Sequence, residues 1–381
     1  MNNGLTITFF SNFLLHHQTP FCEAMVKRIG DGFRFVATEP VPQDRLDMGY
    51  KNLEDTPYAV NAHKDEVSYQ EAMRLGYESD VVIIGSAPDV FIEKRFTENK
   101  LTFRYRERYF KKFRWRFHPK AWQSYLKNDI RYRKKNLHML CASAYTAPDC
   151  RYIHAYPNKT YKWGYFPLVT QIPYEELIKI KAKNDVVRII WVSRFIKLKH
   201  PEEIIRIAHK LKNDGLNFQI EMLGIGELRE QYEQIVKDEN LSDVIIFSGP
   251  FSPPEVLEHM QKADIFLFTS DKNEGWGAVM NESMSSACAV VACREIGSVP
   301  YLIEDGVNGF IYDKHCNNSL YSHVKQLIED KPLREKLQRN AYDSMKNVWN
   351  AEAATDRLLH LIDCIQKGTE TGYTSGPCSR D

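Results

Sequence analysis

Two glutamates, Glu274 and Glu282, lie eight positions apart on either side of an expected helix start. An apolar run at 264–269 precedes them and predicts a strand, and Gly275 and Gly277 lie between them. In open α/β sheets ligands bind in the crevice outside the carboxyl ends of the strands, so both carboxylates can face one crevice. Free N–H groups at a helix start favour a phosphate. The stretch therefore predicts a site for a phosphate flanked by hydroxyl groups, which is the arrangement found in a nucleotide-sugar.

Two further clusters follow expected strands in the same half of the chain. Arg194 and Lys199 come after a strand at 188–192, and Gly224 follows a strand at 218–223. Fixed cations suit a diphosphate, although alone they are also typical of surface charges, and a lone glycine is typical of a simple turn. Parallel strands end at the same edge of a sheet, so we expect all three clusters on one face.

The order of strands and helices predicts two doubly wound domains. From residue 188 onward strands and helices alternate, which favours a parallel sheet. The apolar run at 5–10 predicts a first strand, and the run at 80–85 is typical of a strand buried on both faces. A length of 381 residues suits two domains. We expect an acceptor-binding Rossmann-like domain at 1–176, a linker at 177–187, a nucleotide-sugar-binding Rossmann-like domain at 188–345, a helix at 346–366 that packs back toward the N-terminal domain, and a disordered tail at 367–381.

Residues 94–135, called here the basic-aromatic segment, hold 16 Lys or Arg residues against three acidic ones, although the whole chain carries only +1. Aromatic residues are interleaved with these cations. A solvated helical face would leave the rings exposed to water. A nucleic-acid surface also combines both residue types, but no RNP-like or zinc-finger motif accompanies this one, so nucleic acid is not expected as a partner. We favour an anionic membrane surface, with the rings at headgroup level.

The remaining bulk features favour a cytoplasmic protein. The eight cysteines form no Cys-x-x-Cys pair, which is typical of reduced thiols. The apolar start at 5–10 lacks a basic region before it and predicts a strand rather than a signal peptide. No window of about 18 uncharged apolar residues predicts a membrane span. The prediction is a cytoplasmic protein held peripherally on the inner face of the cell membrane.

The second half of the chain resembles the family 4 retaining glycosyltransferases of the GT-B fold. The resemblance covers residues 188–312 and lies in these motifs: Ser193-Arg194 followed by Lys199, the run 222–228, the run 246–249, Glu274-Gly275-Trp276-Gly277 closing on Glu282 as the family's Glu-x7-Glu signature, the run 297–300 and the run 304–310. The whole chain is also similar to bacterial capsule and exopolysaccharide glycosyltransferases, notably at 11–18 and 161–167. The fold implied is GT-B, with two Rossmann-like doubly wound domains facing each other across a cleft.

The resemblance implies a role for each matching residue. Arg194 and Lys199 would hold the donor's diphosphate and stabilise the leaving nucleoside diphosphate, where negative charge develops. Glu274 would contact the donor-sugar hydroxyls near the reaction centre, and Glu282 the ribose hydroxyls. The other positions implied in donor binding are Gly224, Gly275, Trp276 and Gly277.

The implied activity is retaining hexosyl transfer from a nucleotide-sugar, such as a UDP- or GDP-sugar, to a glycan or polyprenyl-linked acceptor in the biosynthesis of capsule, exopolysaccharide or lipopolysaccharide. Retention in this family is thought to proceed by front-face attack, with the donor phosphate accepting the acceptor's proton. The cations replace a metal ion, and the chain has no Asp-x-Asp motif, so neither a metal nor a cofactor is expected.

The N-terminal half matches the family only in layout, so the acceptor-binding candidates come from position. Many members have a Gly-Gly pair after the first strand; this chain instead has a turn with His16, His17 and Gln18. These side chains are candidates for acceptor binding, although polar residues at a helix start are also common without a ligand. The family's mid-domain histidine has no clear equivalent, and Glu107 or Arg106 is the candidate to serve in its place.

Two other classes of function stay open at this point. One is another GT-B enzyme, such as a sugar-nucleotide epimerase or a glycogen-type phosphorylase. The second carboxylate of Glu-x7-Glu argues against the epimerase, and no lysine in a pyridoxal-phosphate context supports the phosphorylase. The other class is a non-catalytic sugar- or nucleic-acid-binding protein, which salt-sensitive RNA binding without nucleotide-sugar binding would favour.

Overall fold

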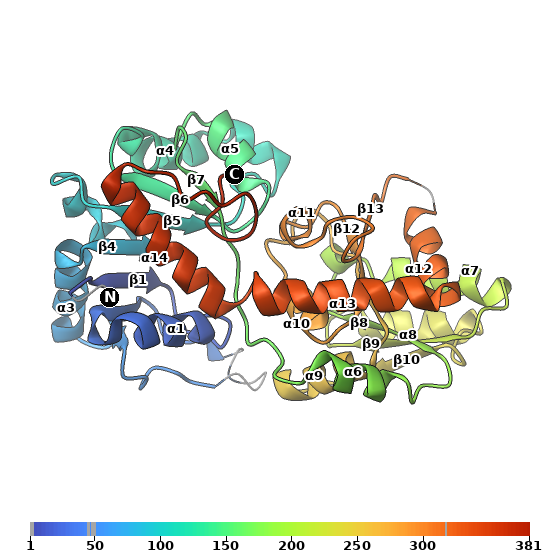
Figure 1. Ribbon diagram of the computed structural model, residues 1–381. Helices are drawn as coiled ribbons and strands as arrows, with labels where there is room; N and C mark the ends of the chain where they lie inside the picture. Colours follow the sequence, from blue (N-terminus) through green and yellow to red (C-terminus); the bar gives the residue numbers. More distant parts are fainter. Residues whose placement is uncertain (1–3, 44–45, 47–50, 317) are drawn as a thin grey trace. The chain divides into compact units, whose positions relative to one another are not determined.

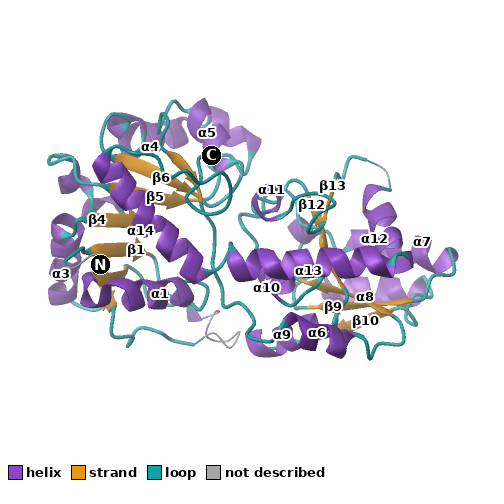
Figure 2. Cartoon of the chain, in the orientation of Figure 1, coloured by secondary structure: helices purple, strands orange, loops and turns teal. Residues whose placement is uncertain are grey.

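The structure, a computed structural model, describes residues 4–43, 46, 51–316 and 318–381 and divides into two compact units (Figure 1). Unit 1 comprises residues 1–168 and 350–381, and unit 2 comprises residues 169–349. Each unit contains one parallel sheet with helices on its faces (Figure 2). The predicted fold class, with two Rossmann-like domains, is therefore confirmed.

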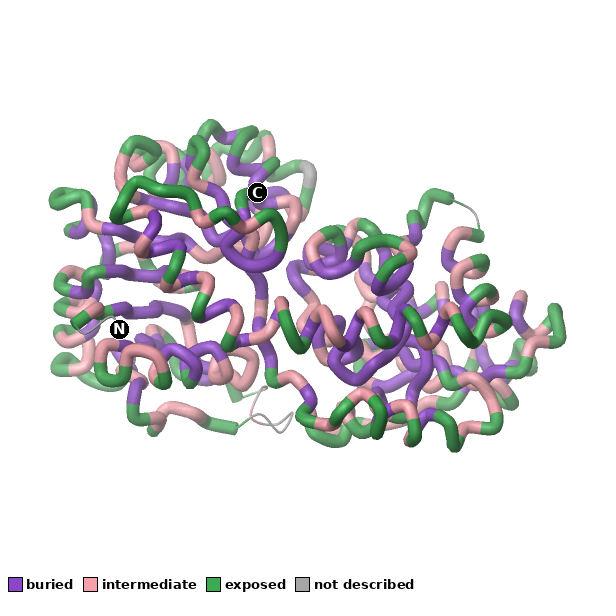
Figure 3. Tube along the Cα trace, in the orientation of Figure 1, coloured by how far each residue is buried: buried purple, intermediate pink, exposed green. Residues whose placement is uncertain are grey.

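Unit 1 contains a seven-stranded sheet in the order β3-β2-β1-β4-β5-β6-β7. The strands are β1 (Ile7–Ser11), β2 (Phe33–Ala37), β3 (Ala59–Asn61), β4 (Val81–Ile84), β5 (Thr102–Arg106), β6 (Leu137–Cys141) and β7 (Thr160–Lys162). Every residue of β1, β4 and β6 is buried, as expected for strands that are covered on both faces (Figure 3). The direction in which the chain adds strands reverses between β1 and β4, which makes this the topological switch point of the sheet.

The helices of unit 1 come from both ends of the chain. They are α1 (Thr19–Ile29), α3 (Glu66–Glu78), α4 (Pro119–Asn128), α5 (Thr146–Tyr152) and α14 (Ala351–Lys367), with 3-10 turns η1 (Gly30–Gly32), η2 (Asp89–Phe91), η3 (Glu93–Phe96), η4 (Phe113–Phe117) and η5 (Ile130–Tyr132). Helix α14 packs on α1, and Arg28 pairs with Asp356 at 2.7 Å between them.

None of the helices in the described part of the chain has the length and apolar character that a membrane span requires.

The tail after α14 departs from the prediction of disorder at 367–381. The N–H of Cys378 donates to the carbonyl of Lys162 at 2.8 Å, and the N–H of Lys162 donates to the carbonyl of Ser379 at 2.9 Å. Tyr161 and Arg380 form an antiparallel bridge, and Cys378 is fully buried. The tail therefore runs along the open edge of β7. Its Gly, Ser and Thr content indicated disorder because composition does not reveal that an unpaired strand edge supplies hydrogen-bond partners.

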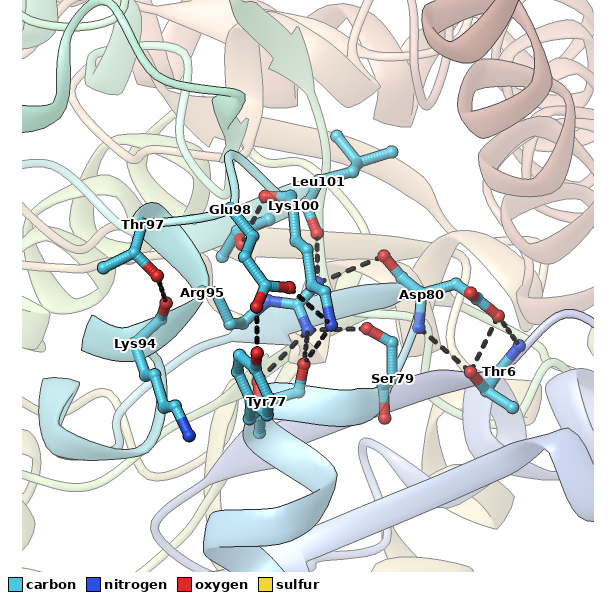
Figure 4. Close-up of polar contacts among 12 residues, drawn as sticks. Thr6, Tyr77, Ser79, Asp80, Lys94, Arg95, Thr97, Glu98, Lys100 and Leu101 are labelled. Atoms are coloured by element: carbon cyan, nitrogen blue, oxygen red, sulfur yellow. Dashed lines mark hydrogen bonds and ion pairs between the residues drawn. The ribbon is translucent and has the colours of Figure 1, made fainter.

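Arg95 is fully buried and ties together the end of the unit 1 sheet where β4 and β5 begin (Figure 4). Its guanidinium donates to the carbonyls of Gly76, Ser79, Asp80 and Leu101 at 2.6–3.1 Å. These carbonyls lie at the C-terminus of α3 and in the loops before the two strands, where a cation also meets the negative end of the helix dipole. Burial lowers the pKa of Arg95 to about 10, so the side chain stays charged at neutral pH.

The rings of the basic-aromatic segment divide into two groups. Tyr109, Phe110 and Tyr125 are buried in the hydrophobic core of unit 1, whereas Trp115 and Phe117 are 42% and 67% exposed. The alternation of rings and cations therefore reflects packing for the first group. The second group, on η4, holds the exposed rings among the described side chains of the segment.

Unit 2 contains a six-stranded parallel sheet in the order β10-β9-β8-β11-β12-β13. Its strands are β8 (Val187–Val192), β9 (Phe218–Leu223), β10 (Ile245–Ser248), β11 (Ile265–Phe268), β12 (Ala289–Cys293) and β13 (Phe310–Tyr312). Its helices are α6 (Tyr174–Lys181), α7 (Glu202–Asn213), α8 (Arg229–Asp238), α9 (Pro253–Lys262), α10 (Val279–Ser285), α11 (Val299–Leu302), α12 (Ser319–Glu329) and α13 (Lys331–Asn347), with the 3-10 turn η6 (Lys197–Lys199).

The stretch predicted as a linker, 177–187, is instead part of unit 2. It holds the second half of α6, a turn and the first residue of β8. Leu177 is fully buried, and the Lys181 ammonium donates to the carbonyls of Met260 and Ala263 at the C-terminus of α9. The high charge of this stretch suggested exposure, but its one leucine and the stem of Lys181 are covered by α9 and the neighbouring helices.

Candidate functional site

The three predicted clusters of unit 2 follow adjacent strands of its sheet. Arg194 follows β8, Gly224 follows β9 and Glu274 follows β11, and β8 pairs with both β9 and β11. The loops therefore meet at the carboxyl edge of the sheet, where the strand order reverses between β8 and β11.

Gly224 and Gly226 allow the loop after β9 to contact the loop after β8 backbone to backbone. Both have positive φ, +142° and +150°. A Cβ on Gly224 would lie 1.9 Å from the Ser193 carbonyl oxygen, and one on Gly226 would lie 2.5 Å from that of Phe195. The N–H of Phe195 donates to the carbonyl of Ile225 at 2.8 Å across this contact. Gly224 thus sets the position of the loop that carries Arg194.

Arg229, which the sequence analysis did not single out, connects the loops after β9 and β10. Its guanidinium donates to the carbonyls of Gly224, Ser248 and Gly249 at 2.6, 3.1 and 3.2 Å, and its Nε donates to Glu233 at 2.7 Å. A cation three positions after Gly226 gives no motif of its own. Its role is visible only once the two loops are known to be neighbours.

Lys199 and Glu274 form an ion pair that joins the loop after β8 to the loop after β11. Their side chains are only 12% and 15% exposed. The backbone fixes the same contact, because the N–H of Asp271 donates to the carbonyl of Leu198 and the N–H of Glu274 donates to the carbonyl of Asp271, both at 3.0 Å. Two residues implied in catalysis therefore neutralise each other.

Arg194 and Glu282 are the two predicted site residues whose charges stay without a partner. Arg194 is exposed, and no carboxylate of the described residues lies within ion-pair distance of it. Glu282, on α10, is half-buried, and its carboxylate has no hydrogen bond or ion pair to a described residue of unit 2. Burial raises the pKa of Glu282 to about 7. A cation and a carboxylate left in this way can bind a phosphate and hydroxyl groups respectively.

The loop between the two glutamates is held from inside the unit. Trp276 is fully buried, packs against Trp349 at 5.9 Å between ring centroids, and donates its indole N–H to Asn281 at 2.8 Å. Its ring is therefore held by other side chains of unit 2, and the donor contact of Trp276 stays a prediction. Gly275 is also buried, and Gly277 has φ of +75° with the Phe268 ring where a Cβ would lie.

Unit 1 holds a cavity of about 1130 Å³ at the carboxyl ends of β1, β4 and β5. His17, Gln18 and Glu107 line it, whereas His16 does not, although the rings of His16 and His17 are 3.7 Å apart. Gln18 uses its amide oxygen to accept from the N–H of Leu15 at 2.9 Å, so it also holds the turn after β1. Three of the four predicted acceptor candidates thus lie around one cavity.

Comparison with known proteins finds a family match in unit 2. The model of the family "Glycosyl transferases group 1" matches residues 174–344, which lie entirely within unit 2. A Campylobacter jejuni N-acetylgalactosamine-N,N'-diacetylbacillosaminyl-diphospho-undecaprenol 4-alpha-N-acetylgalactosaminyltransferase is 28% identical over 49% of this chain and 51% of its own. A Corynebacterium aurimucosum D-inositol 3-phosphate glycosyltransferase is 27% identical over 44% of this chain and 41% of its own. The chain thus spans about half the length of the curated relatives it matches.

The solved structures extend the likeness to both units. HepE from Anabaena, solved in complex with UDP, aligns with 94% of this chain and 100% of its own at a TM-score of 0.69, with 13% sequence identity. At this identity the likeness shows the fold alone. Together with the two parallel sheets it establishes the GT-B architecture.

We predict that Arg229→Met weakens the binding of nucleoside diphosphates roughly tenfold, the equivalent of about 1.4 kcal/mol, because three carbonyls lose a charged donor and the loop beside Arg194 shifts. Calorimetric titration with UDP and GDP measures this. Arg206→Met is the matched control, since Arg206 pairs with Glu203 on the surface of α7. Equal loss in both variants would contradict a positioning role for Arg229.

We predict that Glu282→Gln raises the melting temperature at pH 8 by a few degrees but not at pH 4.5. The pKa of about 7 lies above the ordinary 4.5, so between these values the folded chain holds a proton that the unfolded chain has lost. Wild-type stability therefore falls as pH rises from about 4.5 to 7, and glutamine removes that loss. Thermal unfolding at both pH values, with Glu258→Gln on α9 as the control, tests it; a pH-independent difference would refute the assignment.

Proposed function

We propose that the protein is a retaining glycosyltransferase that moves a hexosyl group from a nucleotide-sugar to a glycan or lipid-linked glycan in polysaccharide biosynthesis. The observation that carries this proposal is the grouping in unit 2 of an unpaired cation, an unpaired carboxylate and the Lys199–Glu274 pair at the carboxyl ends of β8 and β11. The match of unit 2 to glycosyl transferases group 1 and the likeness to a UDP-bound structure support it.

In this proposal the donor diphosphate binds Arg194 and competes with Glu274 for Lys199. The two cations then stabilise the negative charge that develops on the leaving group as the glycosidic bond breaks. Glu274, released from Lys199, accepts hydrogen bonds from the sugar hydroxyls, and Glu282 accepts them from the ribose. The donor phosphate takes the acceptor's proton on the same face of the sugar, which retains the anomeric configuration. Fixed cations supply the charge, so we propose that transfer needs no metal ion.

We further propose that the protein works peripherally at the cytoplasmic face of an anionic membrane. Exposed Trp115 and Phe117 lie on η4 beside exposed Lys112, Arg114 and Lys120. Aromatic rings at headgroup level and nearby cations together favour binding to anionic lipid. A lipid-linked acceptor, such as the one in the name of the Campylobacter relative, would be presented at the same surface.

We expect the purified protein to release a nucleoside diphosphate from one nucleotide-sugar of a UDP, GDP and ADP series when a lipid-linked glycan is present, with or without EDTA. Glu274→Ala and Arg194→Gln should each lower kcat about 100-fold or more, since each removes a group that acts on developing charge or on sugar position. Glu258→Gln is the control. NMR of the product should show the donor's anomeric configuration.

Other outcomes of this assay would exclude the proposal. Full activity in Glu274→Ala would remove the assigned site. An epimerised nucleotide-sugar formed without acceptor would favour the epimerase, and no turnover together with no nucleotide-sugar binding would favour a non-catalytic protein.

We expect the triple variant Lys112→Glu, Arg114→Glu and Lys120→Glu to bind phosphatidylglycerol vesicles at least tenfold more weakly, at about 1 kcal/mol for each cation near the surface. Arg116 is left intact because its guanidinium packs on the rings of Phe110 and Tyr152. Vesicle sedimentation at low and high salt measures the effect. The control is the triple variant Lys237→Glu, Lys262→Glu and Lys336→Glu, which changes three exposed lysines of unit 2. Equal binding by both triple variants would contradict a membrane role for η4 and α4.

A further inference from the structure

The charges that line the cavity of unit 1 do not balance. Its lining includes five Lys or Arg residues and three acidic residues: Arg104, Arg106, Arg108, Lys111, Lys127, Asp89, Glu93 and Glu107. Three of these cations have acidic partners in the same lining. Arg104 pairs with Asp89 at 2.9 Å, Lys111 with Glu107 at 2.5 Å and Lys127 with Glu93 at 3.8 Å. Every acidic group of the lining is therefore already paired, and Arg106 and Arg108 have no acidic partner within the lining.

Arg106 is one of the two, at the last position of β5. Among the described residues, no carboxylate lies within ion-pair distance of its guanidinium and no hydrogen bond is formed by it. The guanidinium lies over the buried Tyr109 ring, 4.0 Å from its centroid. Stacking on a buried ring fixes the plane of the guanidinium while its N–H donors stay unused, so the group is preorganised for an oxyanion.

Arg108 is the other. Its ion-pair partner is Asp149, outside the lining, whose Oδ2 lies 3.7 Å from the arginine Nε, too far for a hydrogen bond. That oxygen already accepts from the backbone N–H groups of Tyr109 and Phe110, at 2.9 and 3.1 Å. The Nε of Arg108 is buried and has no hydrogen-bond partner. A buried donor left unsatisfied costs about 1–3 kcal/mol unless a ligand satisfies it.

We propose that Arg106 and Arg108 bind a phosphate or diphosphate ester on the acceptor. This assignment rests on the proposed transferase function and adds a chemical class to its acceptor. Phosphate oxygens suit two neighbouring guanidinium groups, because each planar fork can donate two parallel hydrogen bonds. The sugar to be extended then occupies the rest of the cavity, near His17, Gln18 and Glu107.

The rim of the cavity favours an ester over free phosphate. Val90 and Trp115 line the cavity and are 43% and 42% exposed, so apolar surface lies beside the cationic one. A prenyl chain attached to the diphosphate would cover these side chains and remove them from water. The acceptor class that fits both features is a prenyl-type diphosphate carrying a glycan.

Calorimetric titration with geranyl diphosphate tests the subsite directly, in an Arg194→Gln background that suppresses diphosphate binding in unit 2. We expect Arg106→Gln to raise the Kd roughly 10- to 100-fold, since a charge-assisted bidentate contact is lost. Arg106→Lys should restore only part of the affinity. Arg131→Gln changes an exposed arginine of the same segment that lies over the Tyr132 ring but outside the cavity lining, and it should leave the Kd unchanged.

The same series separates the possible outcomes. Unchanged affinity in Arg106→Gln, or in Arg106→Lys if the glutamine variant does not fold, overturns the proposal. Inorganic diphosphate that binds as tightly as the geranyl ester assigns the site to a free anion and overturns the lipid part. Nucleotide-sugar binding, measured in the Arg106 variants with Arg194 intact, should stay unchanged. If the transferase assay detects no activity while geranyl diphosphate still binds, the proposed function is refuted but the assignment of the anion subsite stands.

Discussion

The candidate donor site of unit 2 depends on the backbone contact between the loops that follow β8 and β9. Side chains cannot enter this contact, because a Cβ on Gly224 would lie 1.9 Å from the Ser193 carbonyl oxygen. Arg229 then fixes the outer side of the same loop through three carbonyls. Arg194 projects from a loop that is held on one side by β9 and on the other by the Lys199–Glu274 pair. The rigid elements thus position a cation that itself has no partner, as a preorganised site requires.

Buried cations stabilise the opposite ends of both sheets. Arg95 donates to carbonyls at the C-terminus of α3 in unit 1, and Lys181 donates to carbonyls at the C-terminus of α9 in unit 2. In each unit a long basic side chain satisfies helix-end carbonyls that would otherwise be buried without donors. The amino ends of the strands are closed in this way by internal hydrogen bonds. The carboxyl ends keep their polar groups for ligands.

The sequence predicted the fold class and the loops of unit 2 well because both depend on local patterns. Short runs rich in apolar residues, at 188–192, 218–223 and 264–269, indicated β8, β9 and β11 directly. The tail at 367–381 was predicted wrongly because its partner, the edge of β7, lies more than 200 residues away in the sequence. The ring of Trp276 packs against Trp349, a contact that no local pattern indicates. Arg229 was missed for the same reason.

Composition also could not separate the cations of the basic-aromatic segment by role. Arg95 is a buried structural donor, Arg104 is neutralised by Asp89, and Arg114 is an exposed charge. Arg106 differs from all three, since it is partly buried and stacked on a ring but forms no ion pair or side-chain hydrogen bond with a described residue. Unit 1 carries Arg106 at the carboxyl end of β5, as unit 2 carries Arg194 after β8, and each lies beside a cation that a carboxylate already neutralises. In each unit one arginine, Arg106 or Arg194, has no carboxylate partner among the described residues, and a phosphate supplies the charge that it lacks.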